Sequence, residues 1–442
     1  MKDQPLLNTS GGSDDNVDVG QDSRTLDRGT PSPQSPSAIA KGVICSAVAE
    51  SVAGAFGDRL RALILTGSLA RDEATVLEKN GTRELLGDAE FLLVFAEGVV
   101  LPSAGAIHRL GQEIEGRLAQ RGVHSPLDLD AVHSGFLREL RPHIFAYELR
   151  TCGQVVWGDQ QILSLIPASS GADIPLEDAW RLLSNRMIEQ LDAAIELASN
   201  PSALPRSVQY RTVKLYQDMA TSFLVFAGAY EPTYRGRAER LRALAADPST
   251  SWDLPFPLHE FSNRVSACTN FKLQGNQDGS LSSTGDCPPS IAFWQEAVTQ
   301  ARLLWRWELM RLTHSHAALS DQELMKKWMS MQPLRDRLRG WAYVLRRCGW
   351  HRSWREWPRW VRRARQASPR YCVYAAASQL FFQLPGALGP ASQPPAIRRD
   401  WEAWRSWLPM DHHDPKVLAA DWQQAIFAIS ENYKRFLTGT RA

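Results

Sequence analysis

Two short apolar runs, each adjoining a polar motif, most constrain the fold of this chain. The first, Leu60–Thr66 (LRALILT), stops at Gly67-Ser68, and the second, Ala89–Phe95 (AEFLLVF), directly follows Asp88. Runs of this length, rich in branched and aromatic residues and bounded by turn residues, are typical of buried strands. The sequence therefore predicts a sheet whose strands carry polar groups at their ends.

Helical periodicity surrounds these strands. Apolar residues recur every three or four positions before the first run and again over 103–120, and a third run, 127–132 (LDLDAV), alternates apolar and acidic residues. Strands alternating with helices predict an α/β core with a mixed sheet, which we expect over 41–167. From about residue 176 the pattern is helical, which predicts an all-α helical bundle over 168–313.

The last part of the chain, 314–442, differs in composition. Between Arg335 and Arg370 there are twelve arginines, five tryptophans and only two acidic residues. The apolar residues there fall at helical spacing, so each helix would have an apolar face beside a cationic rim. We expect a basic helical extension that packs on the bundle. The alternatives to packing on the bundle are that residues 335–370 bind an anionic membrane surface or nucleic acid.

Length and composition set the class of protein. The chain has 442 residues, about three domains at roughly 150 residues each, and a net charge of only +2. Residues 1–40 are rich in Ser, Gly, Asp and Pro, which predicts a disordered tail without a signal peptide. No apolar run approaches the roughly 18 residues that a membrane span requires. These features predict a cytoplasmic protein.

The segment 66–73 (TGSLARDE) has the chemistry of a phosphate-binding turn. A Gly-Ser pair that leaves a buried strand and opens a helix presents backbone N–H groups and a hydroxyl, and glycine permits close approach. Gly67 and Ser68 are therefore candidate phosphate-binding residues. Arg71 stands one helical turn further on, where it can reach the same phosphates or pair with Asp72 or Glu73.

Acidic residues on two predicted strands have the chemistry of a magnesium site. Asp88 and Glu90 are two residues apart at the start of a strand, so both carboxylates project from one face. Hard oxygen ligands suit Mg²⁺, which keeps several waters and shares substrate phosphates. Asp128 and Asp130 also share one strand face, and either would supply a third carboxylate and help deprotonate an acceptor hydroxyl. Asp128 is favoured as the third carboxylate because it lies between two leucines, Leu127 and Leu129.

One side of the predicted helix 208–227 adds a further candidate. Its only charged residues, Arg211, Lys214 and Asp218, are spaced so that they share one side of the helix. Two roles are open to them. They form an ion pair within the helix at the surface of the bundle, or they line a cleft in which Lys214 meets phosphate or acceptor.

Taken in order, these motifs resemble a known superfamily. The order of motifs is a Gly-Ser pair after a strand, then Asp-x-Glu, then an isolated acid on a later strand. This order resembles that of the nucleotidyltransferase superfamily that includes DNA polymerase beta. Within them, TGSLARDE (66–73) and GDAEFLLVF (87–95) resemble the bacterial small-substrate branch, such as the aminoglycoside nucleotidyltransferases. The stretch YELRTCGQVVWGD (147–159) looks like the family's closing strand.

The resemblance implies residue roles and an architecture. It implies a nucleotidyltransferase fold in which Gly67 and Ser68 hold a triphosphate, while Asp88 and Glu90 bind metal and the third acid is Asp128 or Asp130. The chain departs from the family in the spacing between the Gly-Ser pair and the acids, which predicts an inserted surface loop over 74–86.

The implied activity is magnesium-dependent nucleotidyl transfer. A nucleoside monophosphate would pass from an NTP, with ATP favoured, to an acceptor hydroxyl, and pyrophosphate would be released. A small-molecule acceptor is favoured over RNA or protein. The alternative from another class is a non-catalytic nucleotide-binding or scaffold module.

Overall fold

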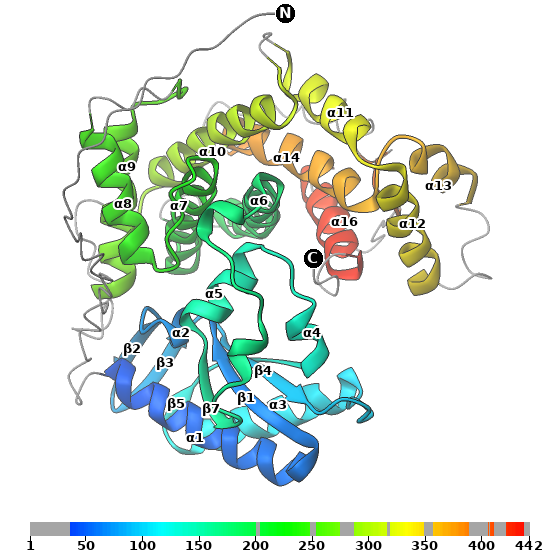
Figure 1. The fold of residues 1–442 in the computed structure, drawn as a ribbon. Coiled ribbons are helices and arrows are strands. Elements are labelled where there is room, and N and C mark those ends of the chain that lie inside the picture. Colours follow the sequence, from blue (N-terminus) through cyan, green and yellow to red (C-terminus); the bar gives the residue numbers. More distant parts are fainter. Residues whose placement is uncertain are drawn as a thin grey trace, which may run out of the picture.

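A computed structural model describes most of the chain after the predicted tail. The described residues are 36–199, 204–247, 253–274, 287–315, 319–348, 357–388, 405, 407–410 and 421–436. The predicted disordered tail, 1–40, lies outside this part except for its last five positions, which are helical. The chain forms an α/β core, and helices stack on one side of it (Figure 1).

The core is a four-stranded mixed sheet in the order β6-β4-β1-β7. Strands β1 (Leu60–Thr66) and β4 (Ala89–Phe95) pair antiparallel and have the predicted bounds. Strand β6 (Leu127–His133) lies parallel to β4, and β7 (Gln154–Gly158) is antiparallel to β1. A parallel pair needs a crossover, which here contains helix α3 (Ala104–Gln120).

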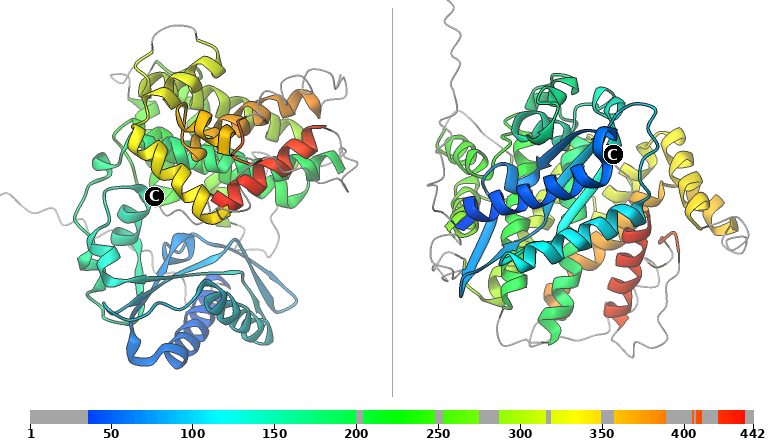
Figure 2. Two further views of the ribbon diagram at one scale, coloured as in Figure 1. Left: turned by 90° about the vertical axis from the view of Figure 1, so that its right-hand side faces the viewer. Right: turned by 90° about the horizontal axis from the view of Figure 1, so that it is seen from below.

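Helices α1 (Pro36–Phe56) and α3 cover one face of the sheet (Figure 2, right). Among the described helices, only the stretch containing α1, Pro36–Arg59, is long and apolar enough to cross a membrane, which the sequence analysis did not anticipate. Its residues Ile44, Val48 and Val52 are fully buried against this core. In this structure the helix is therefore a layer of the α/β core.

The predicted inserted loop is instead a β-hairpin. Strands β2 (Thr75–Lys79) and β3 (Thr82–Leu86) pair antiparallel, and β3 also pairs with the short β5 (Val123–His124). Both turn residues, Asn80 and Gly81, have positive φ, at 53° and 75°. An Asn-Gly turn of this type matches the twist of antiparallel strands, so the sequence did carry a hairpin signal.

The predicted closing strand, 147–159, is only half correct. Its first half belongs to helix α5 (Ile144–Cys152), and only Gln154–Gly158 forms strand β7. Gly153 separates the two elements. At the start of α5, the side-chain Nδ1 of His143 caps the helix by accepting a hydrogen bond from the backbone N–H of Ala146. Short helix α4 (Ser134–Arg138) precedes it and covers the same face of the sheet (Figure 1).

In the described part of the chain, six helices form the bundle that sits over the core. They are α6 (Leu176–Ser199), α7 (Arg206–Phe226), α8 (Tyr234–Ala246), α9 (Leu258–Gln274), α10 (Ile291–Leu312) and α11 (Asp321–Met331). Helix α7 is central, as its nearly all-round apolar sequence predicts.

The C-terminal extension packs on this bundle. It comprises α12 (Leu334–Cys348), α13 (Trp357–Ala364), α14 (Pro369–Ala387) and α16 (Asp421–Phe436). Their buried side chains belong to the same hydrophobic core as those of α6 to α11. The indole N–H of Trp341 donates to the Ala367 carbonyl at 2.8 Å, and that of Trp360 donates to the Pro409 carbonyl at 2.7 Å. The described tryptophans therefore dock within the molecule.

The bundle is tied to the core by hydrogen bonds from α7, α8 and α9. Tyr210 of α7 donates its hydroxyl to the Leu86 carbonyl at 2.5 Å, and Thr75 donates to the Lys272 carbonyl at 2.9 Å. The Glu73 carboxylate accepts from the backbone N–H groups of Tyr234 and Arg235 at the start of α8. These contacts join the helices to the β2–β3 hairpin and to Glu73, on the side of the core that faces the bundle (Figure 2, left).

Candidate functional site

The Gly-Ser turn stands directly against the predicted metal-binding strand. Thr66, the last residue of β1, is the register partner of Glu90 on β4. Gly67 follows with φ of +69°, and a Cβ built there would lie 2.8 Å from the Glu90 carboxylate. Only glycine adopts this positive φ and leaves room for the Glu90 carboxylate without strain. The structure thus brings Gly67, Ser68 and Glu90 together, as the motif order suggested.

The predicted carboxylates gather on one face of the sheet. Asp128 on β6 is the register partner of Glu90, whereas Asp130 pairs two positions further on, with Leu92. Glu90 is partly buried, while Asp88, Asp128 and Asp130 are exposed. Burial raises the pKa of the Glu90 carboxyl, and the nearby acids Asp128, Glu148 and Asp88 raise it further, against an opposing effect of Arg71.

The described residues contain no ready-made metal site. No group of three or more His, Cys, Asp or Glu side chains in this part of the chain is arranged to hold a metal ion. The donor chemistry nevertheless fits magnesium, because the carboxylates of Asp88, Asp128 and Glu148 are close enough to Glu90 to raise its pKa, and Mg²⁺ prefers such oxygen ligands. Acidic oxygens that repel one another in the metal-free protein are those that a cation would draw together.

Arg71 takes the ion-pairing role that the sequence left open. Its Nη1 lies 2.7 Å from the Glu148 carboxylate and its Nε lies 3.5 Å from Glu73. Glu148 also accepts hydrogen bonds from Tyr230 and Arg237, which are both buried. These two residues therefore serve packing and hydrogen bonding. Glu148 was missed because its segment was predicted to be a strand, whereas on α5 it faces this network.

A cluster of cations lies above the start of β4. The side chain of Lys272 is buried, and its ammonium group donates to the Tyr210 hydroxyl at 2.9 Å. Lys214 lies over the Tyr210 ring, with its ammonium 5.9 Å from the ring centroid. The nearby Arg186 guanidinium, followed by burial, lowers the pKa of Lys214, and burial lowers that of Lys272.

Among the described ion pairs, none joins Arg211, Lys214 and Asp218 of α7 to one another. Arg186 of α6 contacts the Asp218 carboxylate, and Arg211 lies 4.0 Å from Glu196 of the same neighbouring helix. The prediction of an ion pair within this helix is therefore wrong, because Arg211 and Asp218 each pair with a residue of α6. Lys214 lies between Arg211 and Asp218 in the sequence and faces the ring of Tyr210. The hydroxyl of Tyr210 donates to the carbonyl of Leu86, the residue before Gly87-Asp88.

A cavity of about 460 Å³ opens between the acidic face of the sheet and the bundle. Glu90, Asp128 and Asp130 line its sheet side. Its helical side is lined by residues that include Glu148, Asp178, Arg181, Asn185, Arg370 and Tyr374. Gly67, Ser68, Asp88 and Lys214 are not among its lining residues, so they flank the cavity and do not form its wall.

Comparisons with known proteins leave the site to be judged on its own geometry. No family model matches this chain, and no curated protein shows a significant match to it.

Proposed function

We propose that the protein is a magnesium-dependent nucleotidyltransferase with a nucleotidyltransferase-type α/β core. The observation that carries this proposal is the contact between the Gly67 turn and the Glu90 carboxylate, with Asp128 in register on the other side of Glu90. A turn that can hold phosphate thus adjoins carboxylates that can hold a cation. Nucleotidyl transfer requires these two groups at one place.

The phosphates of an NTP would lie between the Gly-Ser turn and the cations of the bundle. The turn offers backbone N–H groups and the Ser68 hydroxyl. Lys214 lies above the adjoining strand, and its lowered pKa reflects positive charge already held there by Arg186. An anion would offset this repulsion, so we place Lys214 and Lys272 beside the triphosphate. Arg71 would then act through Glu148 and Glu73 as a positioning residue.

Asp88, Glu90 and Asp128 would hold Mg²⁺, which supplies charge neutralisation for the phosphates. In the transfer, the acceptor oxygen bonds to the α-phosphorus as the bond from that phosphorus to the bridging oxygen breaks. Pyrophosphate leaves with the bridging oxygen. Asp128, or Asp130 beside it in the cavity, accepts the hydroxyl proton. Most of the rate acceleration would come from positioning and electrostatic stabilisation.

The test is incorporation of label from α-labelled NTPs in the presence of Mg²⁺ and a cell extract, together with pyrophosphate release. Asp88→Asn should abolish both signals without lowering thermal stability, because it removes one of several neighbouring acids. Asp58→Asn, at an exposed position before β1, is the matched control and should retain full activity.

Two results would redirect the proposal. Full turnover by Asp88→Asn would show that the site is assigned to the wrong residues. NTP binding by the wild-type protein without pyrophosphate release would favour the non-catalytic module. If label enters RNA or protein, salt sensitivity of the binding would identify the nucleic-acid case.

A further inference from the structure

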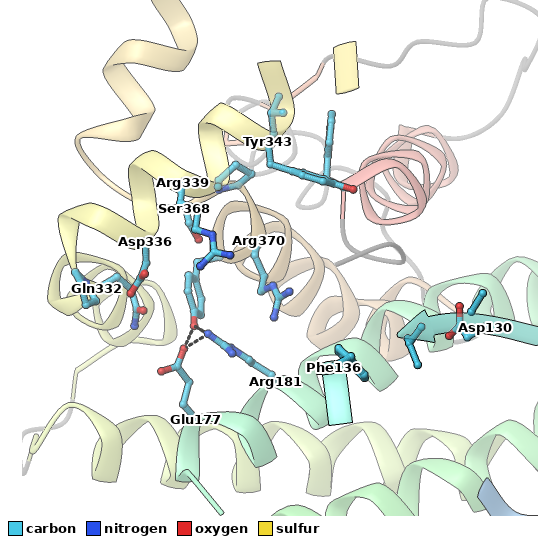
Figure 3. Close-up of a pocket in the computed structure, with 18 residues that line it drawn as sticks. Asp130, Phe136, Glu177, Arg181, Gln332, Asp336, Arg339, Tyr343, Ser368 and Arg370 are labelled. Atoms are coloured by element: carbon cyan, nitrogen blue, oxygen red, sulfur yellow. Dashed lines mark hydrogen bonds and ion pairs between the residues drawn. The ribbon is translucent and has the colours of Figure 1, made fainter. Parts of the chain in front are cut away.

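A larger cavity, of about 900 Å³, adjoins the first and is shown in Figure 3. Asp130, Phe136, Arg181 and Arg370 line both cavities, so these residues mark the boundary between the two. From there the larger cavity extends from the edge strand β6 to helices α12 and α14. A molecule bound in it can therefore extend to the acidic face of the sheet.

Three arginines from three separate helices meet in this cavity. Arg181 comes from α6, Arg339 from α12 and Arg370 from α14, and their guanidinium groups point into the same space (Figure 3). Arg181 is held in place by an ion pair with Glu177 and by hydrogen bonds of 3.1 and 3.0 Å to the Tyr371 hydroxyl. Positioned guanidinium groups suit carboxylates and phosphates, which they bind through paired hydrogen bonds.

A tight helix contact builds the wall that carries two of these arginines. A Cβ at Gly340 would lie 2.8 Å from Cδ of Pro369, so α12 reaches the start of α14 only because residue 340 is glycine. The Trp341 hydrogen bond to the Ala367 carbonyl secures the same contact. Arg339 precedes the glycine and Arg370 follows the proline. The approach of the two helices therefore sets the separation of the two guanidinium groups.

The two cavities differ in charge. The smaller one is lined by Glu90, Asp128, Asp130, Glu148 and Asp178, against Arg181 and Arg370. In the larger one, Glu177 is ion-paired with Arg181, Asp130 lies at the boundary, and Asp336 lies beside Gln332 (Figure 3). The larger cavity therefore has three arginines against three acids, whereas the smaller has five acids against two arginines, so an anion is repelled less in the space around Arg339 and Arg370.

We propose that the larger cavity binds the acceptor through an oxyanion, a phosphate monoester or a carboxylate, held by Arg339 and Arg370. The acceptor hydroxyl would then be directed past the cavity boundary towards Asp128 and Asp130. The term acceptor rests on the proposed nucleotidyl transfer, but the binding of an anionic hydroxyl compound does not. The acceptor class is thus a small hydroxyl compound with an anionic group at its far end.

The experiment compares matched pairs of probes with and without the anion. Glucose 6-phosphate, ribose 5-phosphate and glucuronate are paired with glucose and ribose, and binding is measured by saturation-transfer NMR without nucleotide. Transfer is then measured with α-labelled ATP and Mg²⁺. We expect only the anionic members to bind and to become labelled. Arg339→Gln and Arg370→Gln should each weaken binding, and raise the KM for the acceptor, about tenfold, with kcat and the KM for ATP unchanged.

Arg346→Gln is the matched control, because Arg346 is exposed on the same helix as Arg339 and does not line the cavity. It should leave both measurements at wild-type values. Arginine-dependent binding of the anionic probes without any transfer would support the cavity assignment while refuting the proposed activity. Transfer to neutral and anionic probes alike, unchanged by Arg339→Gln and Arg370→Gln, would overturn the assignment while leaving the activity intact. Failure of every anionic probe to bind would also overturn it.

Discussion

The buried carboxyl of Glu308 should make the helical part less stable as the pH rises. Glu308 lies on α10 with 0% of its surface exposed. Among the described residues, no hydrogen bond of standard geometry reaches either carboxyl oxygen, although the nearby Ser222 hydroxyl partly favours the ionised form. Burial dominates and raises the pKa of Glu308 from 4.5 to about 8.

The sign and size of the effect follow from proton linkage. Between pH 4.5 and about 8 the folded protein holds a proton on Glu308 that the unfolded chain has released, so stability falls as the pH rises. The slope is about 1.4 kcal/mol per pH unit, or about 2.7 kcal/mol between roughly pH 5.5 and 7.5. For a cooperative unit of about 260 residues, the entropy of unfolding is about 0.55 kcal/mol per kelvin, which makes the shift about 5 °C.

The perturbation is Glu308→Gln, which keeps the side-chain volume and removes the titration. The assay is thermal unfolding followed by far-UV circular dichroism at several pH values across that range. The Tm of wild type minus that of the variant should fall by about 5 °C from roughly pH 5.5 to 7.5. Glu260→Gln, at an exposed position on α9, should follow wild type throughout. Parallel Tm curves for wild type and Glu308→Gln would refute the reasoning.

Three further predictions concern the site and the extension. Gly67→Ala should abolish transfer by displacing the Glu90 carboxylate. The control is Gly57→Ala, which is also at positive φ but has no neighbour within 4 Å; it should lose similar thermal stability and keep its activity. Equal activities of the two variants would contradict the contact between Gly67 and Glu90. Asp128→Asn should reduce kcat severely and Asp130→Asn mildly, because only Asp128 is in register with Glu90; equal, mild losses would remove β6 from the metal site. A protein ending at Ser330 should bind a hydrophobic dye and lose solubility, because it exposes the core that the extension covers. If the full-length protein floats with anionic vesicles and the shortened one stays soluble and active, the extension is a membrane anchor.

Local signals in the sequence were enough for several elements of the core. Strands β1 and β4 have their predicted bounds because each is a continuous apolar run between turn residues. The segments 74–86 and 147–159 were interpreted wrongly for different reasons. The hairpin signal of Asn80-Gly81 was present but not used, whereas 147–152 is helical because its buried side packs over the sheet. The sequence alone does not determine that packing.

For the candidate site too, some features could be predicted from the sequence and others depended on strand pairing. Asp88 and Glu90 are two residues apart, so strand periodicity was sufficient to place them on one face, and Gly67-Ser68 was predicted as the turn that follows the preceding strand. The register of Asp128 with Glu90 is a property of strand pairing, which separates it from Asp130 although the two look equivalent in the sequence.

The partners of that site were decided only by the tertiary structure. Lys272, Arg339 and Arg370 are more than a hundred residues from Glu90 along the chain, and each belongs to a helix whose local pattern indicates only packing against other helices. Their positions depend on helix contacts such as that of Gly340 with Pro369. The sequence by itself therefore pointed to the Gly67-Ser68 turn, Asp88 and Glu90 as a candidate site, because these residues are close along the chain. The cavities and cations around them exist only because long-range packing brings helices from the other end of the chain over the sheet.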